Sequence, residues 1–490
     1  MSRYAPKNCT QNPDDFEEMF PPDFLPFPDK PKEPPDDAFE DYYDTDDFPE
    51  LPDDEDVSCH ETPEQITEAF NKARFIFAEG VSRSLNDYET GLNNNVCIVG
   101  GSGTGKTTSF IEPNIIEPQG SMILSDPKGT LLQKYGDFLK SIGYMLKIVN
   151  LPYPDKSVCW NPLSNLHSTQ DIVCLANAIV FDSRSVCTSD PFWDNANVMY
   201  LCALIGYMVE AKYIPFNFRG LLRLMDEGER FTRRIEREGY RQNTEKASKL
   251  ADRFERLHRN NRNSWAYEQF KAVDSASEKT YDSIRVTLAA KLANFTSREL
   301  EKMMSDNEID FADIAKQRTA VFVLQSDTDR SMDTLVNLFF SQAINSLISY
   351  ANTCENQRLP IPVRFFLDDY GATTAIDNLD TIISTIRSRA ISVSLILQSE
   401  AQLENRRKLG ADKTILANCD TYIYMGGNDI ETARAVSQRC NKPLEQVLYM
   451  PVGHCWVFQR GKKPVYAEIA PRPNLHELEK HLREHDSDNM

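Results

Sequence analysis

The chain has 490 residues, of which 41% are hydrophobic, and its 54 Lys and Arg against 74 Asp and Glu give a formal net charge of −20. This length suggests about three structural units, and the hydrophobic content excludes a fibre or a small scaffold that depends on disulfides. The eleven cysteines form no CxxC pair and leave one over, which is typical of a compartment that keeps thiols reduced.

Two features of the chain bear on membranes. The first ten residues lack the apolar core of a signal peptide. The longest apolar run, Val198 to Val209, has twelve residues, whereas a membrane-spanning helix needs about 20. We therefore expect a cytoplasmic protein without a membrane span of its own, attached peripherally to the inner face of the cell membrane through a partner.

The first 60 residues differ from the rest in composition. Residues 1–60 hold 19 Asp and Glu, 4 Lys and Arg, and 11 of the 27 prolines, so they carry −15 of the net charge. A segment that repels itself and lacks periodicity cannot offset its ordering entropy, and we predict a disordered acidic tail. Its spaced aromatic residues suit docking on a partner, although a solubilising tail is the more frequent explanation. Residues 476–490 form a second, charged tail.

Short apolar runs predict buried strands, with helix-like stretches between them. The predicted strands are residues 96–99, 122–124, 144–149, 319–324, 363–367, 392–397, 421–424 and 454–458. A helical stretch near residues 63–79 precedes the first strand. Alternation of strands and helices is typical of a parallel sheet.

The alternation stops between about Ser164 and Ile314, where almost only segments with a 3.6-residue period remain. The predicted helices are residues 171–181, 194–211, 219–237, 246–259 and 279–304. The predicted fold class is therefore α/β, with one domain in two parts, residues 61–163 and 315–475. An all-α insertion over residues 164–314 interrupts it.

The string GGSGTGKT directly follows the first predicted strand and fits the P-loop pattern. Backbone N–H groups of such a loop surround phosphates, and the following helix adds the positive end of its dipole. We expect Lys106 to reach the β- and γ-phosphates of a nucleotide and the Thr107 hydroxyl to bind Mg²⁺. The expected nucleotide-binding residues are Gly100, Gly101, Ser102, Gly103, Thr104, Gly105, Lys106, Thr107 and Thr108.

Polar side chains follow two later strands. In VRFFLDDYG, Asp368 is the expected Mg²⁺ carboxylate and Asp369 the group that orients the attacking water, although two aspartates after a strand can also simply begin a turn. One strand later, Gln398 ends SVSLILQ as a candidate sensor of the γ-phosphate or of that water, or alternatively as a capping residue.

Two arginines precede that later strand. In IRSRA, Arg387 or Arg389 is a candidate arginine finger in a ring, and a solvated helix end is an equally good explanation. The string NKPL at 441–444 lacks the Asp that reads guanine, which favours ATP over GTP.

Further segments occur in a specific order: NVCIVGGSGTGKTTSFIEPNII, SMILSDPKGTLL, WNPL, DPFWDNA, VRFFLDDYG, RSRAISVSLILQSEAQLE and TILANCDTYIYMGGND. Over about residues 90–470 the chain thereby resembles the type IV coupling proteins, the TraG-like conjugative DNA-transfer ATPases of bacterial type IV secretion systems. The P-loop is shared by many ATPases, but SDPKG, the insertion opening with FW, and LILQSEAQL are together specific to this family.

The resemblance implies RecA-like motor domains in a homohexameric ring, with ATP and Mg²⁺ as cofactors. It implies as partners a relaxase, DNA as a single-stranded transfer intermediate, and a membrane-anchored subunit of the secretion system. The all-α domain would recognise the substrate. By the same match, Lys106, Asp368, Asp369 and Gln398 take the roles given above, while Asp126 and Lys128 belong to a second-strand motif without an assigned role.

The chain departs from the family pattern at three places. An acidic tail stands where the family usually has N-terminal membrane helices, Asp369 replaces a Glu that is one methylene longer, and Thr130 replaces an acidic residue. The shorter carboxylate leaves open a nucleotide-gated substrate receptor that hardly hydrolyses ATP. A translocase of double-stranded DNA of the FtsK/HerA kind is the other alternative.

The net charge argues against broad coating of the protein by DNA, since such affinity comes from Lys and Arg. Residues 229–263 hold 11 Lys and Arg against 6 Asp and Glu. Their cations recur at helical spacing and would form stripes for DNA, although interspersed glutamates make a solvated helix face the commoner explanation. These cations are Arg230, Arg234, Arg237, Arg241, Lys249, Arg253 and Arg256.

Overall fold

The computed structural model describes residues 61–117, 120–181, 191–235, 243–326, 328–371, 376, 378–403 and 410–475. The predicted acidic tail, residues 1–60, and the charged segment 476–490 lie outside the described residues, so both remain predictions.

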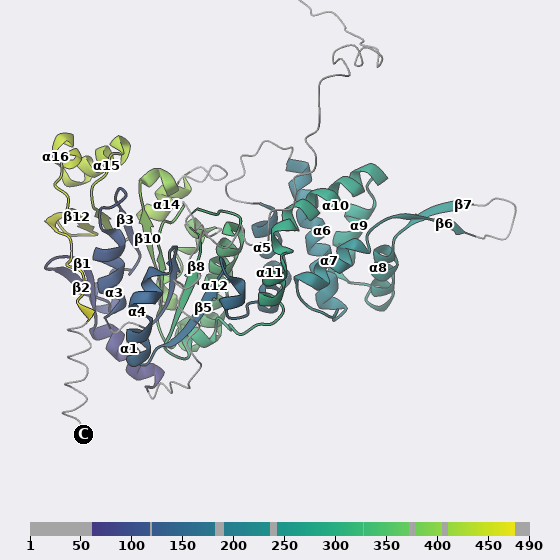
Figure 1. Ribbon diagram of the computed structural model, residues 1–490, viewed down its shortest axis with the longest axis horizontal. Helices are drawn as coiled ribbons and strands as arrows, with labels where there is room; N and C mark the ends of the chain where they lie inside the picture. The colour runs from purple at the N-terminus through teal and green to yellow at the C-terminus, as the bar shows by residue number, and fades with distance from the viewer. Residues whose placement is uncertain are drawn as a thin grey trace, which may run out of the picture. The chain divides into compact units, whose positions relative to one another are not determined.

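A nine-stranded sheet is the centre of the α/β part, with the strand order β13-β12-β11-β3-β10-β9-β4-β8-β5 (Figure 1). Neighbouring strands from β11 to β5 run parallel, and β12 and β13 complete one edge in antiparallel pairing. The strands are β3 (Val96–Val99), β4 (Ser121–Asp126), β5 (Met145–Asn150), β8 (Thr319–Leu324), β9 (Val363–Leu367), β10 (Ile391–Leu397), β11 (Thr421–Tyr424), β12 (His454–Gln459) and β13 (Val465–Glu468).

The eight strands predicted from the sequence are all confirmed, with ends shifted by at most two residues. The central strands are buried on both faces, and this burial requires the continuous apolar runs by which they were recognised. The sequence did not predict β13, because three of its four residues are exposed and it has no apolar run.

The predicted helix over residues 63–79 is wrong in its second half. Helix α1 (Pro63–Lys72) starts with a capping box of Thr62 and Gln65 and ends where Ala73 turns extended. The chain then forms a hairpin of β1 (Arg74–Ala78) and β2 (Val81–Ser84). Phe75 and Phe77 alternate along β1 and are fully buried, so a period of two prevails over the helical one here.

Each face of the sheet has its own core. On one face Phe110, from the segment after β3, packs with Phe75 of β1 at 5.8 Å between ring centroids, and helix α4 (Thr130–Ser141) adds Tyr135 and Phe138. On the other face the long helix α12 (Asp333–Thr353) presents Phe339 and Phe340 to the sheet, where Phe340 meets Phe365 of β9. Because neighbouring side chains of a strand point to opposite faces, consecutive residues of β9 pack into different cores.

Seven helices lie between β5 and β8 in the chain, among the described residues of that stretch: α5 (Thr169–Val180), α6 (Pro191–Glu210), α7 (Phe218–Asp226), α8 (Lys249–Asn260), α9 (Trp265–Asp274), α10 (Glu278–Leu292) and α11 (Arg298–Met303). Their apolar residues continue the core that contains α12. Trp160 of the WNPL segment is fully buried and packs edge-on against Phe339 at 5.0 Å, which anchors the start of the insertion to the α/β part.

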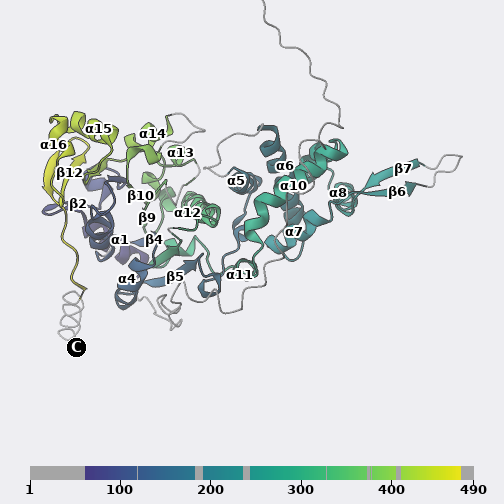
Figure 2. The same ribbon diagram turned by 45° about the horizontal axis from the view of Figure 1, so that its top comes forward.

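The insertion is not all-α, which corrects the prediction. Strands β6 (Phe231–Ile235) and β7 (Asn243–Ala247) form an antiparallel hairpin, and both views show them side by side (Figures 1 and 2). The predicted helices 219–237 and 246–259 are confirmed over α7 and α8 and are wrong where they extended into these strands. Their arginines and lysines recur at helical spacing, but helical spacing of charges without a matching apolar face does not hold a helix in place.

Helix α6 contains the longest apolar run of the sequence. It is buried along most of its length at the centre of the insertion, which accounts for an apolar character on all sides. Within the described part of the chain, no helix combines the length and the apolarity needed to cross a membrane.

We predict that Gly206→Leu destabilises the protein by about 1–3 kcal/mol, because α6 packs closely on α9 at this glycine. A Cβ at Gly206 would lie 3.0 Å from both the Ala266 Cβ and the Trp265 ring. Thermal unfolding would show a lower midpoint, whereas the control Ala272→Leu on the exposed side of α9 would keep the wild-type midpoint. Equal midpoints for both variants would contradict the close packing of α6 on α9.

Candidate nucleotide-binding site

The P-loop lies at the carboxyl ends of the central strands. It follows β3 directly, and backbone hydrogen bonds hold it on both sides: Gly100 N donates to Leu397 O of β10 at 3.1 Å, and Gly101 N donates to Gly426 O after β11 at 2.8 Å. A helical segment follows, as one π-helical turn (Thr107–Ile111) and then α3 (Glu112–Ile115). The sequence prediction of strand, loop and helix is confirmed.

Three glycines of the loop are required by its geometry. Gly103 and Gly105 have positive φ angles of 76° and 89°, where side chains are strained. A Cβ at Gly100 would lie 2.6 Å from Thr104 Oγ1 and 3.0 Å from the Met425 Cβ. A residue larger than glycine at any of these three positions would therefore distort the tight loop.

Lys106 and Thr107 make different contacts at this loop. The buried ammonium group of Lys106 donates to the Gly100 and Gly101 carbonyl oxygens at 2.6 and 2.9 Å, inside the loop. Burial lowers the pKa of Lys106, an effect that the nearby Asp369 and Asp368 carboxylates oppose. The Thr107 hydroxyl instead donates to Asp368 Oδ2 at 2.7 Å and so joins the P-loop to the end of β9.

The two aspartates after β9 have different surroundings. Asp368 is buried, and burial raises the pKa of its carboxyl group while the hydrogen bond from Thr107 opposes the shift. Asp369 adopts a left-handed backbone conformation with φ of 50°, and its Oδ1 accepts a hydrogen bond from Gln398 Nε2 at 3.3 Å. The structure therefore brings together Lys106, Thr107, Asp368, Asp369 and Gln398, which come from three separate parts of the sequence.

Two residues that the sequence analysis did not identify, Ser125 and Gln325, connect Asp368 to the neighbouring strands through hydrogen bonds. Ser125 of β4 donates from Oγ to the Asp368 carbonyl oxygen at 3.3 Å, and Gln325, just after β8, donates from Nε2 to Ser125 Oγ at 2.7 Å. Both side chains are buried at the ends of neighbouring strands. Only the strand order, which places β9, β4 and β8 side by side, reveals this chain of contacts.

In the structure, Asp126 of the SDPKG segment binds backbone N–H groups at the start of helix α4. Its Oδ2 accepts hydrogen bonds from Leu131 N and Leu132 N at 3.0 and 2.9 Å, in the first turn of α4. Burial raises the pKa of Asp126 from the ordinary 3.8 to about 6. Asp126 thus stabilises the start of the helix after β4. Its position just after a predicted strand could already be read from the sequence.

A second buried carboxylate supports the helix after the P-loop. Glu112 accepts hydrogen bonds from Tyr135 Oη at 2.8 Å, Arg472 Nε at 2.9 Å and Lys134 Nζ at 3.1 Å. Burial, together with Glu112, raises the pKa of Tyr135. Since Arg472 follows β13, this cluster ties the C-terminal end of the described chain to the P-loop helix.

Arg387 and Arg389 do not join this site within the chain. They precede β10, whereas Gln398 follows it, so the whole length of the strand separates them from the nucleotide site. Arg387 donates from Nη2 to Asp87 O at 3.1 Å, and Arg389 donates from Nε to Asn352 Oδ1 at 3.1 Å. A role as arginine finger toward a neighbouring subunit remains a prediction.

Of the two predicted helical stripes of cations, the first is wrong among the described residues, whereas the three cations of the second do share one helix. Arg234 lies on β6, and Lys249, Arg253 and Arg256 lie on α8, while Arg237 and Arg241 are outside the described residues. Arg253 pairs with Glu227, with 2.9 Å between Nη2 and Oε1, and this hydrogen bond raises the pKa of Arg253. Arg230 donates to Asp274 Oδ1 at 2.9 Å and covers the Tyr281 ring.

The residues present fit a nucleotide with Mg²⁺. A threonine hydroxyl and a carboxylate that already touch each other provide the hard oxygen ligands that Mg²⁺ prefers. The glycine-rich loop runs into the N-terminus of a helix, where backbone N–H groups are arranged to bind phosphates. The fold and this site together define an α/β protein of the P-loop class.

The family follows from comparison with known proteins. Residues 61–443 match the profile of the family described as "Type IV secretory system Conjugative DNA transfer". This match covers most of the chain, and the protein belongs to that family, as its sequence motifs predicted.

Among curated proteins, the chain is 19% identical over 359 residues to the type IV secretion system-coupling protein VirD4 of Bartonella quintana (strain Toulouse). The aligned region covers 71% of this chain and 53% of that protein, so the chain spans about half the length of this relative.

Solved structures of a bacterial conjugative coupling protein have a similar fold. TrwBdeltaN70 in complex with sulphate gives a TM-score of 0.60 at 14% identity, covering 84% of this chain and 93% of that one. TrwB with the ATP analogue ADPNP gives 0.59 at 14% identity, and TrwB with ADP and Mg²⁺ gives 0.57 at 14% identity, each covering 84% of this chain and 92% of that one. The likeness confirms the predicted α/β fold with its largely parallel sheet.

We predict that Asp126→Asn changes the pH dependence of stability measured without nucleotide. Between pH 4 and 6 the folded wild type binds more protons at Asp126 than the unfolded chain, so this residue's contribution to stability is present below pH 4 and lost as the pH rises through 6. The variant has no carboxyl group at this position, so it does not lose this stability as the pH rises. Its stability relative to wild type should therefore rise by roughly 2–3 kcal/mol from pH 4 to pH 7.

Urea unfolding at a series of pH values measures this difference. An exposed carboxylate, Glu299→Gln on α11, is the matched control and should give a constant offset over the same range. A constant offset for Asp126→Asn as well would contradict the raised pKa.

Proposed function

We propose that this protein is an ATP-hydrolysing coupling protein of a conjugative type IV secretion system, which recruits relaxase-bound DNA and translocates it to the transfer channel. The observation that carries the proposal is the joined group of Thr107, Asp368, Asp369 and Gln398 beside the P-loop. Membership of the conjugative DNA transfer family supports the biological role. The related TrwB has been solved with ADPNP and with ADP and Mg²⁺, which supports ATP and Mg²⁺ as the cofactors here.

The side chains divide the chemistry among them. Thr107 and Asp368 would hold Mg²⁺, which supplies positive charge to the phosphates when bound. Lys106 would turn from the loop carbonyls to the β- and γ-phosphates, with a short movement of its ammonium group. Asp369, steadied by Gln398, would orient the attacking water and accept its proton.

The assembly that we propose is a homohexameric ring at the inner face of the cell membrane. A membrane-anchored subunit of the secretion system would hold it there, with a relaxase and single-stranded DNA as substrates. Family membership favours this role over a translocase of double-stranded DNA of the FtsK/HerA kind.

A nucleotide-gated receptor with little hydrolysis is the second candidate, and one observation favours it. Asp369 has a short side chain that is already engaged by Gln398 at 3.3 Å. A carboxylate in this position reaches less far toward a water molecule than the Glu that the family usually has.

Steady-state ATP hydrolysis separates the two candidates. The full chain is measured over a range of protein concentrations, with single-stranded DNA, with double-stranded DNA and without DNA, against Lys106→Ala. Turnover that DNA stimulates and that rises more than linearly with protein concentration supports an assembling motor. Tight ATP binding without turnover under every condition supports the receptor.

We predict different losses for the two aspartates. Asp368→Asn should weaken Mg²⁺-dependent binding of a fluorescent ATP analogue, because it removes a charged metal ligand. Asp369→Asn should keep that binding and lower turnover by about 100-fold or more, as expected for loss of a general base. Equal loss of nucleotide binding in both variants would refute these roles.

A further inference from the structure

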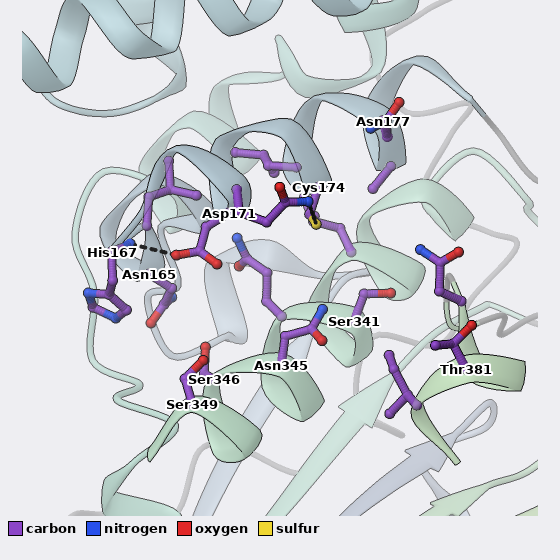
Figure 3. A pocket seen from close by; sticks show the side chains of 18 of the residues that line it. Asn165, His167, Asp171, Cys174, Asn177, Ser341, Asn345, Ser346, Ser349 and Thr381 are labelled. Carbon is purple, nitrogen blue, oxygen red and sulfur yellow. Dashed lines mark hydrogen bonds between the residues drawn. The ribbon is translucent and has the colours of Figure 1, made fainter. Parts of the chain in front are cut away.

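A cavity of about 770 Å³ separates helix α5 of the insertion from helix α12 of the α/β part, and the short helix α13 (Leu379–Ile382) contributes its end wall (Figure 3). Figure 3 shows Asn345 and Ser346 of α12 opposite Asp171 and Cys174 of α5. None of the P-loop residues, Asp368 or Asp369 lines this cavity, which we call the α5–α12 groove.

Uncharged amide side chains dominate the polar part of the groove. Six carboxamides line it, and they come from all of its walls: Asn165, Gln170, Asn177, Gln342, Asn345 and Asn378. Among the described residues of the lining, Asp171 is the one carboxylate, and there is no Lys or Arg. Leu175, Leu338 and Ile382 add apolar surface between the amides.

Several of these amides have hydrogen-bonding capacity left over. Gln342 donates from Nε2 to Pro162 O at 2.8 Å, but its buried Oε1 has no partner in the described part of the chain, and neither has the buried Nδ2 of Asn165. An unsatisfied buried amide atom costs about 1–3 kcal/mol. The Asn345 side chain, which Figure 3 shows at the middle of the groove, makes no hydrogen bond to another described residue.

The groove is long enough for a short stretch of extended chain. Along α12 its lining runs from Leu338 to Ser349, which at about 1.5 Å per residue is about 17 Å. An extended peptide rises about 3.3 Å per residue, so about five residues fill this length.

We propose that the α5–α12 groove binds an extended peptide segment, uncharged or basic, of a protein that this coupling protein recruits. The proposal rests on the proposed function. Carboxamides pair through one N–H and one C=O with the same two groups of a peptide backbone, and the apolar residues between them would hold alternate side chains.

Charge excludes two other occupants. Nucleic acid needs cations to replace the counterions of its phosphates, and the described lining has none. The chain's own segment 1–60 carries −15, and Asp171 would repel it.

The position of the groove gives binding there a consequence. A peptide in the groove would touch α5, which belongs to the insertion, and α12 and α13, which belong to the α/β part. Asn378 follows Asp369 by nine residues in the chain. A recruited protein would thereby contact both parts of the chain at once.

Selection of phage-displayed random dodecapeptides on the purified full chain tests the proposal. Enriched peptides are synthesised with a fluorescent label, and their dissociation constants are measured by anisotropy. We expect uncharged or basic peptides. Asn345→Leu, which keeps the size of the side chain and removes both hydrogen-bonding groups, should weaken their binding about tenfold, and Ala178→Trp, which fills the groove, should weaken it further.

Matched controls lie on exposed positions outside the groove: Asn260→Leu on α8 and Ala272→Trp on α9 should bind the peptides like wild type. All four variants should bind the fluorescent ATP analogue like wild type, which also shows that they fold. Because neither readout depends on turnover, DNA-stimulated hydrolysis without any peptide binding would count against the groove alone. Peptide binding without hydrolysis under any condition would count against the proposed motor alone.

Four results of the selection and binding measurements would overturn the proposal. These are no enrichment, enrichment of acidic peptides, peptide binding that both groove variants leave intact, and loss of labelled oligothymidylate binding in the groove variants in place of peptide binding. A change in sedimentation alone in the groove variants would instead assign the groove to contacts between copies of the chain, and would equally overturn it.

Discussion

The hydrogen bond between Thr107 and Asp368 is the contact on which the arrangement of the site depends. It joins the residue after the P-loop lysine to the end of a strand more than 250 residues later, and it exists because β10 alone separates β3 from β9 in the sheet. Parallel strands bring their carboxyl ends to one edge, so the loop after each strand faces the loops of its neighbours. The buried Ser125 and Gln325 then hold Asp368 from the next two strands.

The insertion leaves this sheet intact for a topological reason. It begins after β5 and ends before β8, and these two strands are neighbours at the edge of the sheet. The chain therefore leaves and re-enters at one place, and Trp160 packs on Phe339 of α12 close to the point of departure. The same junction creates the α5–α12 groove, since α5 is the first helix of the insertion and α12 follows β8 directly.

Buried charges are stabilised in three different ways around the sheet. Asp126 is held by backbone N–H groups of α4, and Glu112 by three side chains that include Arg472. Arg364 of β9 is fully buried, and its guanidinium group lies against the Phe75 and Phe366 rings at 4.2 and 4.7 Å from their centroids. Burial lowers the pKa of Arg364 to about 9. Backbone N–H groups at a helix start, polar side chains and ring faces thus replace water at these three positions.

The sequence by itself determined the P-loop, the aspartate pair and eight of the strands, because these depend on local order: a glycine turn before a helix, polar residues after a strand, and apolar runs buried on both faces. Tertiary structure decided what depends on a distant partner. Glu112 meets Arg472 across 360 residues, Arg253 pairs with Glu227 of another helix end, and β6 and β7 form a hairpin where spacing predicted helices. The periodicity of a segment indicates which of its sides is buried, but only the folded chain shows which residues cover that side.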